Sequence, residues 1–224
     1  MNLDELSQTL GIEIDSELLE LALTHSSFAY ENGLDDNERL EFLGDSVLGF
    51  LVASFVYSAH PELNEGELTK LKNAVVSANA LAAAANQIEL GNYLRLGKGE
   101  EQTEGRTKVN VLADAFEAVL GAAYLSQGLE AASEIVHKFI IPMLDDPDAV
   151  REASDPKTTL GEKLQKMNRP PISYQISATG PEHERIYMAN CFSGEQLLGQ
   201  GSGRTKRSAE TEAAIAALRS LRKK

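Results

Sequence analysis

The segment Asn37–Phe50, NERLEFLGDSVLGF, has the periodicity of one amphipathic helix. At about 100° per residue, Glu38, Glu41 and Asp45 share a stripe about 60° wide. The apolar residues of the segment and its continuation lie on the other side: Leu40, Leu43, Val47, Phe50 and Leu51. Phe42 lies beside the acids. A solvated charged face is the ordinary interpretation of such a stripe, but an aromatic residue beside the acids favours a functional site.

A second acidic pair lies in Val109–Leu125, VNVLADAFEAVLGAAYL. Asp114 and Glu117 are neighbours on one helix face because they are three positions apart. The opposite, apolar stripe consists of Leu112, Ala115, Phe116 and Val119. If the two helices pack together, the acids can meet at a rim, where their mutual repulsion requires a cation. Oxygen ligands without Cys or clustered His predict Mg²⁺ or Mn²⁺ rather than zinc.

These two segments resemble motifs of the ribonuclease III family. NERLEFLGDSVL looks like the family's signature segment, and LADAFEAVLGAAYL is similar to its second acidic motif. The resemblance continues through ALTHSSF (22–28), LNEGELTKLKNAVVS (63–77), LGNYLRLGKGE (90–100) and the C-terminal segment. It therefore covers essentially the whole chain. It implies an endoribonuclease that cleaves double-stranded RNA with Mg²⁺, which Mn²⁺ can replace, and without a small-molecule cofactor.

The resemblance also implies roles for individual residues. The expected metal ligands are Glu41, Asp45, Asp114 and Glu117, and the expected catalytic residues are Asp45, Glu117, Glu38 and Glu65. Glu38 and Glu65 are similar to accessory acids of the cleavage cleft. Phe42 is similar to an aromatic knob that enters a socket on the second subunit of a homodimer. The expected products carry 5′-phosphate and 3′-hydroxyl ends, and the expected cellular role is rRNA and mRNA processing.

Two other functions remain open at this point. The first is a double-stranded RNA-binding protein that does not cleave. Such a protein has no reason to keep four costly, clustered carboxylates. The second is a helical scaffold without any RNA role, which would leave the basic C-terminal part unexplained.

The charge of the chain is divided unevenly. Its 224 residues carry a formal net charge of −13, yet residues 155–224 hold 12 Lys/Arg and 7 Asp/Glu, a net +5. The first 154 residues therefore carry −18. A basic segment beside an acidic one is expected when one part binds a polyanion and the other binds metal ions.

The composition also predicts the compartment. Cys191 is the single cysteine, so no disulfide forms within the chain, which suits a reducing environment. The start, MNLDELSQTL, has no apolar signal-peptide core. No run approaches 18 consecutive apolar residues. We therefore expect a cytoplasmic protein without a membrane span.

Residues 1–145 are predicted to be an all-α endonuclease domain. The helices are expected at 3–10, 16–29, 37–58, 65–77, 80–85, 109–125 and 129–143, with an exposed loop at 91–108. Asn64 is expected to cap its helix together with Glu67. His25 follows an apolar stripe, so we interpret it as a hydrogen-bonded core residue rather than a ligand.

The acidic, proline-containing residues 146–155 are predicted to be a linker. Residues 156–224 then read as α-β-β-β-α, the order of a double-stranded RNA-binding domain with an α+β fold. DPKT, LQK and GQGSGRTKRSAETEAA resemble that domain. The expected RNA-binding residues are Glu162, Gln165, His183, Arg204, Thr205, Lys206 and Arg207. Gly161 departs from the family, in which a glutamine often precedes the glutamate. This glycine should make the helix less stable and remove one minor-groove hydrogen bond, so that RNA binding is weakened but not lost.

Overall fold

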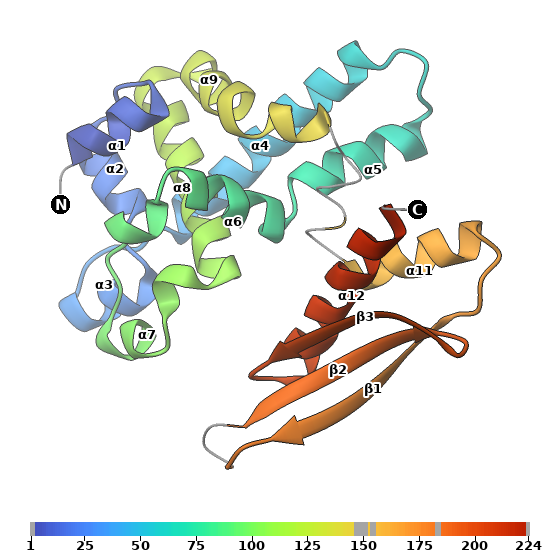
Figure 1. Cartoon of the computed structure of the whole chain (residues 1–224). Helices are drawn as coiled ribbons and strands as arrows, with labels where there is room; N and C mark the ends of the chain where they lie inside the picture. Colours follow the sequence, from blue (N-terminus) through green and yellow to red (C-terminus); the bar gives the residue numbers. More distant parts are fainter. Residues whose placement is uncertain (1–2, 146–151, 153–155, 182–184, 223–224) are drawn as a thin grey trace. The chain divides into compact units, whose positions relative to one another are not determined.

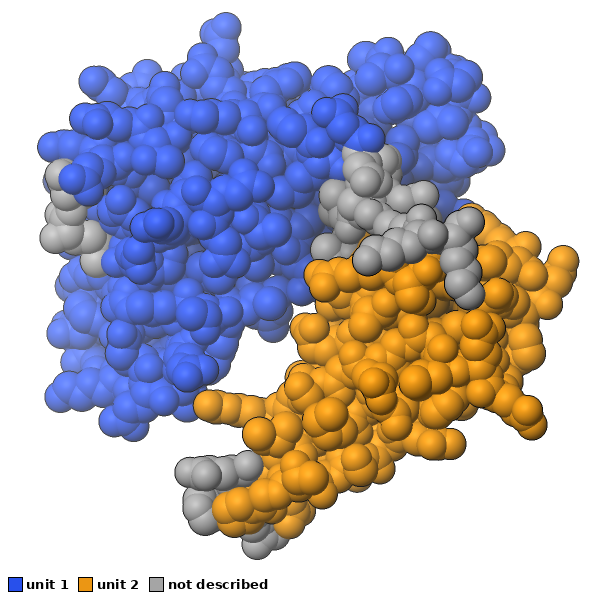
Figure 2. All heavy atoms as spheres, in the orientation of Figure 1, with its two compact units in different colours: residues 1–150 blue, residues 151–224 orange. Residues whose placement is uncertain are grey.

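The structure is a computed structural model that describes residues 3–145, 152, 156–181 and 185–222. The chain divides into two compact units, unit 1 (residues 1–150) and unit 2 (residues 151–224), which Figure 2 colours separately. Unit 1 is built from helices, and unit 2 combines helices with one antiparallel sheet (Figure 1). The predicted fold class, an all-α part followed by an α+β part, is confirmed.

Local sequence signals set the ends of several helices in unit 1. In chain order the elements are α1 (Leu3–Leu10), α2 (Ser16–Ala22), α3 (Ser26–Asn32), α4 (Glu38–Ala59), α5 (Glu65–Val75), α6 (Ala78–Gln87), η1 (Leu90–Tyr93), α7 (Lys98–Gln102), η2 (Gly105–Thr107), α8 (Val109–Gln127), α9 (Leu129–Phe139) and η3 (Ile141–Asp145). Asp15 accepts two backbone N–H groups at the start of α2. Asn64 and Glu67 form the predicted capping box of α5. Gly128, with a φ of 84°, separates α8 from α9.

Helix α8 runs through the middle of unit 1 and packs against α2, α4, α6 and α9 (Figure 1). Phe116 of α8 is fully buried, and so are the small residues Ala115, Ala118 and Ala122. Helix α6 presents buried alanines of its own, which allow two backbones to come close. The core is therefore organised around the second acidic helix.

The apolar side of α4 differs from the predicted one. The buried ridge consists of residues four positions apart: Leu40, Gly44, Leu48, Val52 and Val56. Positions four apart advance by about 40° around a helix, so this ridge turns toward the acids along its length. Phe50, predicted to face the core, is 58% exposed. Phe42 is 77% exposed, as its position beside the acids predicts.

The single helix predicted for residues 16–29 is wrong, because the chain forms α2 and α3 with a corner between them. Thr24 pairs with Arg95 in a short parallel bridge. Arg95 N–H donates to the Leu23 carbonyl (2.8 Å), and His25 N–H donates to the Arg95 carbonyl (3.1 Å). These bonds use backbone groups that a continuous helix would need.

The predicted exposed loop at 91–108 is also wrong in part. It contains α7 and η2, and it contributes the buried side chains Leu94 and Leu96 to the core. The guanidinium of Arg106 donates to the carbonyls of Gly91 and Leu94, both at 2.8 Å. In an exposed loop these carbonyls would accept hydrogen bonds from water, whereas here the Arg106 side chain donates to them.

Helices α4 and α8 are long and apolar enough to cross a membrane if only length and composition are counted. In the most apolar 18-residue window of α8, however, 61% of the residues are buried inside the protein. Both helices also carry the acids of the predicted site. The two helices pack against each other in unit 1, and the corresponding window of α4 is 28% buried.

Unit 2 follows the predicted α-β-β-β-α order. Its elements are α11 (Pro156–Lys166), β1 (Ile172–Thr179), β2 (Ile186–Ser193), β3 (Gln196–Gly203) and α12 (Lys206–Arg222). The sheet order is β1-β2-β3, and both pairs are antiparallel. A Cβ at Gly201 of β3 would lie 2.2 Å from the Ala213 backbone nitrogen. The glycines of GQGSG therefore let α12 lie directly on the sheet.

Candidate metal and cleavage site

Two glycines let α4 and α8 cross in backbone contact. A Cβ built on Gly44 would lie 1.7 Å from the Glu117 carbonyl oxygen, and one on Gly121 would lie 2.3 Å from the Leu40 carbonyl oxygen. No side chain fits at either position. The carboxylates that flank this crossing are therefore brought together from two distant segments of the chain.

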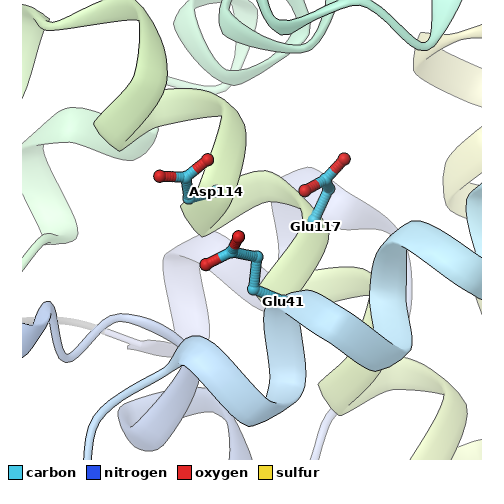
Figure 3. A group of neighbouring side chains, drawn as sticks. All are labelled: Glu41, Asp114 and Glu117. Atoms are coloured by element: carbon cyan, nitrogen blue, oxygen red, sulfur yellow. The ribbon is translucent and has the colours of Figure 1, made fainter.

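Three of the predicted acids form one cluster at this crossing. Glu41 of α4 meets Asp114 and Glu117 of α8, and a carboxylate oxygen of each lies within 4.8 Å of one from each of the others (Figure 3). All three side chains are partly buried. Three oxygen donors from two rigid helices form a suitable site for a hard divalent cation.

The remaining predicted acids of α4 lie around this cluster. Asp45 and Glu38 are exposed, and neither belongs to the group of three. Their charges nevertheless reach it, since Asp45 raises the pKa of both Glu41 and Glu117, and Glu38 raises that of Glu41. Both therefore influence the cluster electrostatically without being among its three donors.

Burial and mutual repulsion disfavour the charged forms of the three carboxylates. Burial raises the pKa of Glu117 to about 8, with further contributions from Asp45, Glu41 and Asp114. Burial and the neighbouring carboxylates also raise the pKa of Glu41. Burial raises the pKa of Asp114. Repulsion of this kind is relieved by protons or by a bound cation.

Glu65 is not brought to the cluster within one chain. It begins α5 and lines a hollow of about 500 Å³ beside Val56 and Tyr57 of α4. Tyr57 is 16 positions after Glu41, which corresponds to roughly 24 Å along the helix. Glu65 therefore cannot take its predicted accessory role at the acidic cluster of its own chain.

His25 was expected to be a core residue, and the structure corrects this. It is only partly buried, and its ring caps α3 by accepting the Ser27 N–H. Electrostatic attraction to His25 partly offsets the burial that raises the pKa of Asp114. The sequence did contain a signal for this corner, because the turn-forming residues THSS (24–27) interrupt an otherwise apolar stripe.

The predicted RNA-binding residues lie on two elements of unit 2. Glu162 and Gln165 are exposed on α11. Arg204, Thr205, Lys206 and Arg207 are exposed around the start of α12, where the Thr205 hydroxyl accepts the Ser208 N–H (3.0 Å). His183 lies outside the described residues. A capped helix start with three cations attracts phosphate groups.

Comparison with known proteins agrees with both units. Residues 15–144 match the family described as Ribonuclease-III-like, and residues 156–221 match the Double-stranded RNA binding motif. The chain belongs to the ribonuclease III family. It is 49% identical to Ribonuclease 3 of Streptomyces coelicolor over 95% of this chain and 78% of that protein. It is 45% identical to Ribonuclease 3 of Thermobifida fusca over 97% of this chain and 91% of that protein.

A solved structure supports the same conclusion for the helical part. The nuclease domain of ribonuclease III from Campylobacter jejuni, described as flexible in a region involved in dimer formation, superposes with a TM-score of 0.59. It is 38% identical and covers 62% of this chain and 96% of that one. The chain is thus an endoribonuclease that cleaves double-stranded RNA. The alternative of a binder that does not cleave is not favoured.

Proposed function

We propose that this ribonuclease III hydrolyses the phosphodiester backbone of duplex RNA with Mg²⁺ held by Glu41, Asp114 and Glu117. The observation that carries the proposal is the convergence of three carboxylate oxygens within 4.8 Å at a crossing of two helices. The donor set is all oxygen, which favours Mg²⁺, or Mn²⁺ in its place, over zinc. When bound, Mg²⁺ lowers the pKa of a coordinated water and neutralises charge on the leaving oxygen.

The surrounding acids have separate roles in this proposal. Asp45, exposed one turn beyond Glu41, orients the attacking water by accepting a hydrogen bond. Glu38 lies on the other side of Glu41 and acts as an accessory acid at the cleft. Attack in line with the 3′-oxygen leaves 5′-phosphate and 3′-hydroxyl ends. The substrates are duplex regions of rRNA and mRNA precursors in the cytoplasm.

The proposed active form is a homodimer in which Phe42 enters a hollow on the second copy. Phe42 is exposed on α4, and beside it lies a hollow of about 810 Å³ lined largely by leucines, including Leu18, Leu21 and Leu125. A projecting ring and an apolar hollow on the same surface are self-complementary under a twofold axis. An accessory role for Glu65 follows only if the second copy carries it to the cleft.

The proposed division of labour assigns chemistry to residues 1–145 and duplex binding to residues 156–224, joined by the linker 146–155. Supporting this, the acidic part carries the cluster of three carboxylates and the basic part carries the exposed start of α12. Duplex binding by this second part should be salt-sensitive, because it rests on contacts to phosphates.

The proposal is tested by Glu117→Gln, which keeps the shape of a proposed ligand and removes its charge. We expect duplex cleavage to fall by at least about 100-fold, while a gel shift in Ca²⁺ still shows binding. Glu134→Gln makes the same change on an exposed residue of α9 and should cleave normally. A Glu117→Gln enzyme that cleaves like the Glu134→Gln control would rule out the metal site.

A further inference from the structure

An acidic residue lies one helical turn from the cations at the start of α12. Glu210 follows Lys206 by four positions and Arg207 by three, so the three side chains share one face of the helix. Lys206 and Arg207 are exposed, and neither forms an ion pair with another described residue of unit 2. A free carboxylate on this face would compete with RNA phosphates for both cations.

The carboxylate of Glu210 is instead engaged by a residue of a different helix. It is ion-paired with the ammonium of Lys157, the second residue of α11. The side chain of Glu210 is 20% exposed and that of Lys157 is 37% exposed, so the pair is partly shielded from water. The Lys157 ammonium also lies over the ring of Tyr174 of β1, 5.0 Å from the ring centroid. Contacts to two further elements therefore hold this lysine at the carboxylate.

A second ion-paired lysine of α11 provides a comparison within the same unit. Lys163 pairs with Glu152, which precedes α11 in the sequence. This pair carries the same charges on the same helix, but its acid is not on α12. The pair formed by Lys157 is thus the one that engages an acid of the helix proposed to bind phosphates.

We propose that Lys157 is a positioning residue for duplex binding, because its ion pair keeps the Glu210 carboxylate away from the cations at the start of α12. This inference rests on the phosphate-binding role proposed for that helix start. Without Lys157, the carboxylate would pair with Lys206 or Arg207, and RNA would have to displace it. The energy of such a pair on a helix surface in water corresponds to about a two- to fivefold loss of affinity.

The ordinary alternative is that the ion pair only stabilises unit 2, and Glu210→Gln separates the two roles. The pair is absent from Lys157→Met, from Glu210→Gln and from the double variant, so a purely stabilising role predicts the same direction of change in all three. The proposed role predicts weaker binding in Lys157→Met alone. Glu210→Gln removes the competing charge, so the double variant should bind at least as tightly as the wild type.

The test measures the fluorescence anisotropy of a labelled RNA duplex of about 16 base pairs, with the full chain in Ca²⁺. We expect Lys157→Met to weaken binding about two- to fivefold at low salt, and Lys157→Met/Glu210→Gln to restore it. The difference between these two variants should narrow as salt is raised. Wild-type affinity in Lys157→Met would overturn the proposal, and so would a double variant that binds as weakly as Lys157→Met.

Two control variants separate this effect from a general change of charge. Lys163→Met removes the same charge and an ion pair from α11, and it should weaken binding less than Lys157→Met; equal losses would overturn the proposal. Glu212 is an exposed acid of α12, about 120–140° around the helix from both cations. Adding Glu212→Gln to Lys157→Met should not restore binding, and full restoration would show that the position of the acid is irrelevant.

A third variant tests the role on which the inference rests. Lys206→Met should weaken duplex binding by itself, because it removes a proposed phosphate contact. Wild-type affinity in this variant would overturn the phosphate-binding role of the start of α12, and the inference with it. A loss in Lys206→Met together with wild-type affinity in Lys157→Met would overturn the role of Lys157 alone.

Cleavage kinetics provide a second readout that a loss of folded enzyme would not reproduce. In Mg²⁺, Lys157→Met should raise KM for the duplex and leave kcat unchanged, because the acidic cluster lies in unit 1. The double variant should return KM to the wild-type value. A lower kcat at unchanged KM would mean that the substitution reduces the amount of active enzyme, and it would overturn the proposal.

Discussion

Replacing Gly44 with alanine should separate α4 from α8 and open the acidic cluster. The new methyl carbon would lie 1.7 Å from the Glu117 carbonyl oxygen, so reaching an ordinary contact of 3.4 Å requires a shift of about 1.7 Å. No rotamer change relieves this clash, because both atoms are fixed to helix backbones. Overpacking costs about 1–3 kcal/mol, and a backbone clash belongs at the upper end.

The effect can be measured on stability and on cleavage. A loss of about 3 kcal/mol lowers the Tm by about 6–12 °C, at about 2–4 °C per kcal/mol for a unit of this size. Misplacement of the carboxylate by more than about 1 Å should reduce cleavage by about 100-fold or more. Calorimetry and a duplex-cleavage assay in saturating Mg²⁺ provide the two values.

Gly49→Ala is the matched stability control on the same helix. A Cβ at Gly49 meets nothing within 4 Å, so alanine should raise stability by about 0.5–1 kcal/mol through its higher helix propensity. If Gly44→Ala melts and cleaves like the wild type, backbone contact is not what brings Glu41 to Glu117. If Gly49→Ala loses stability and cleavage as Gly44→Ala does, α4 does not tolerate substitution in general, and the backbone contact at Gly44 is not the specific cause.

Three further predictions concern charge, assembly and RNA. Because the pKa of Glu117 rises from 4.5 to about 8 on folding, the metal-free protein should lose stability as pH rises through that interval. Added Mg²⁺ should therefore stabilise more at pH 8 than at pH 5, and Glu117→Gln should flatten the pH dependence measured by thermal melts; an unchanged slope would contradict the assignment. Phe42→Glu should shift the mass in light scattering toward a monomer, and a fully active dimer would exclude Phe42 as the contact. Gly161→Gln should tighten duplex binding a few-fold to about tenfold and raise the Tm, since a Cβ there meets only Ile172 Cδ1 at 3.6 Å; weaker binding or a lower Tm would show that the glycine is needed.

Local patterns in the sequence were sufficient for the parts of the molecule that local physics controls. The acids three and four positions apart predicted a shared helix face, and Glu41, Asp114 and Glu117 do meet. The capping box at Asn64 was predictable for the same reason, since all its atoms lie within one turn. The strands of unit 2 were likewise predictable from their alternation and β-forming residues.

Contacts between distant segments were not predictable in this way. The helix expected across residues 16–29 breaks because Thr24 pairs with Arg95, far along the chain. The loop expected at 91–108 folds inward around Arg106, whose partners are also carbonyls outside its own turn. In both places a polar backbone group forms a hydrogen bond with a residue far away in the sequence. The local periodicity of hydrophobic residues does not predict such a bond.

The meeting of the acids likewise depends on a contact between distant segments and not on a local pattern. An ideal helical wheel places the acids of α4 opposite the core, so it predicts at most that they meet the acids of α8 at the rim of the contact. In the structure the meeting point is set by the buried ridge, which advances around α4 and passes through Gly44, where Gly121 of α8 faces it. Neither glycine carries a functional group, and neither spacing marks it as special. The acidic cluster is therefore brought together by a pair of small residues whose meeting is a property of the packed fold, and the acids supply the chemistry of the proposed metal site.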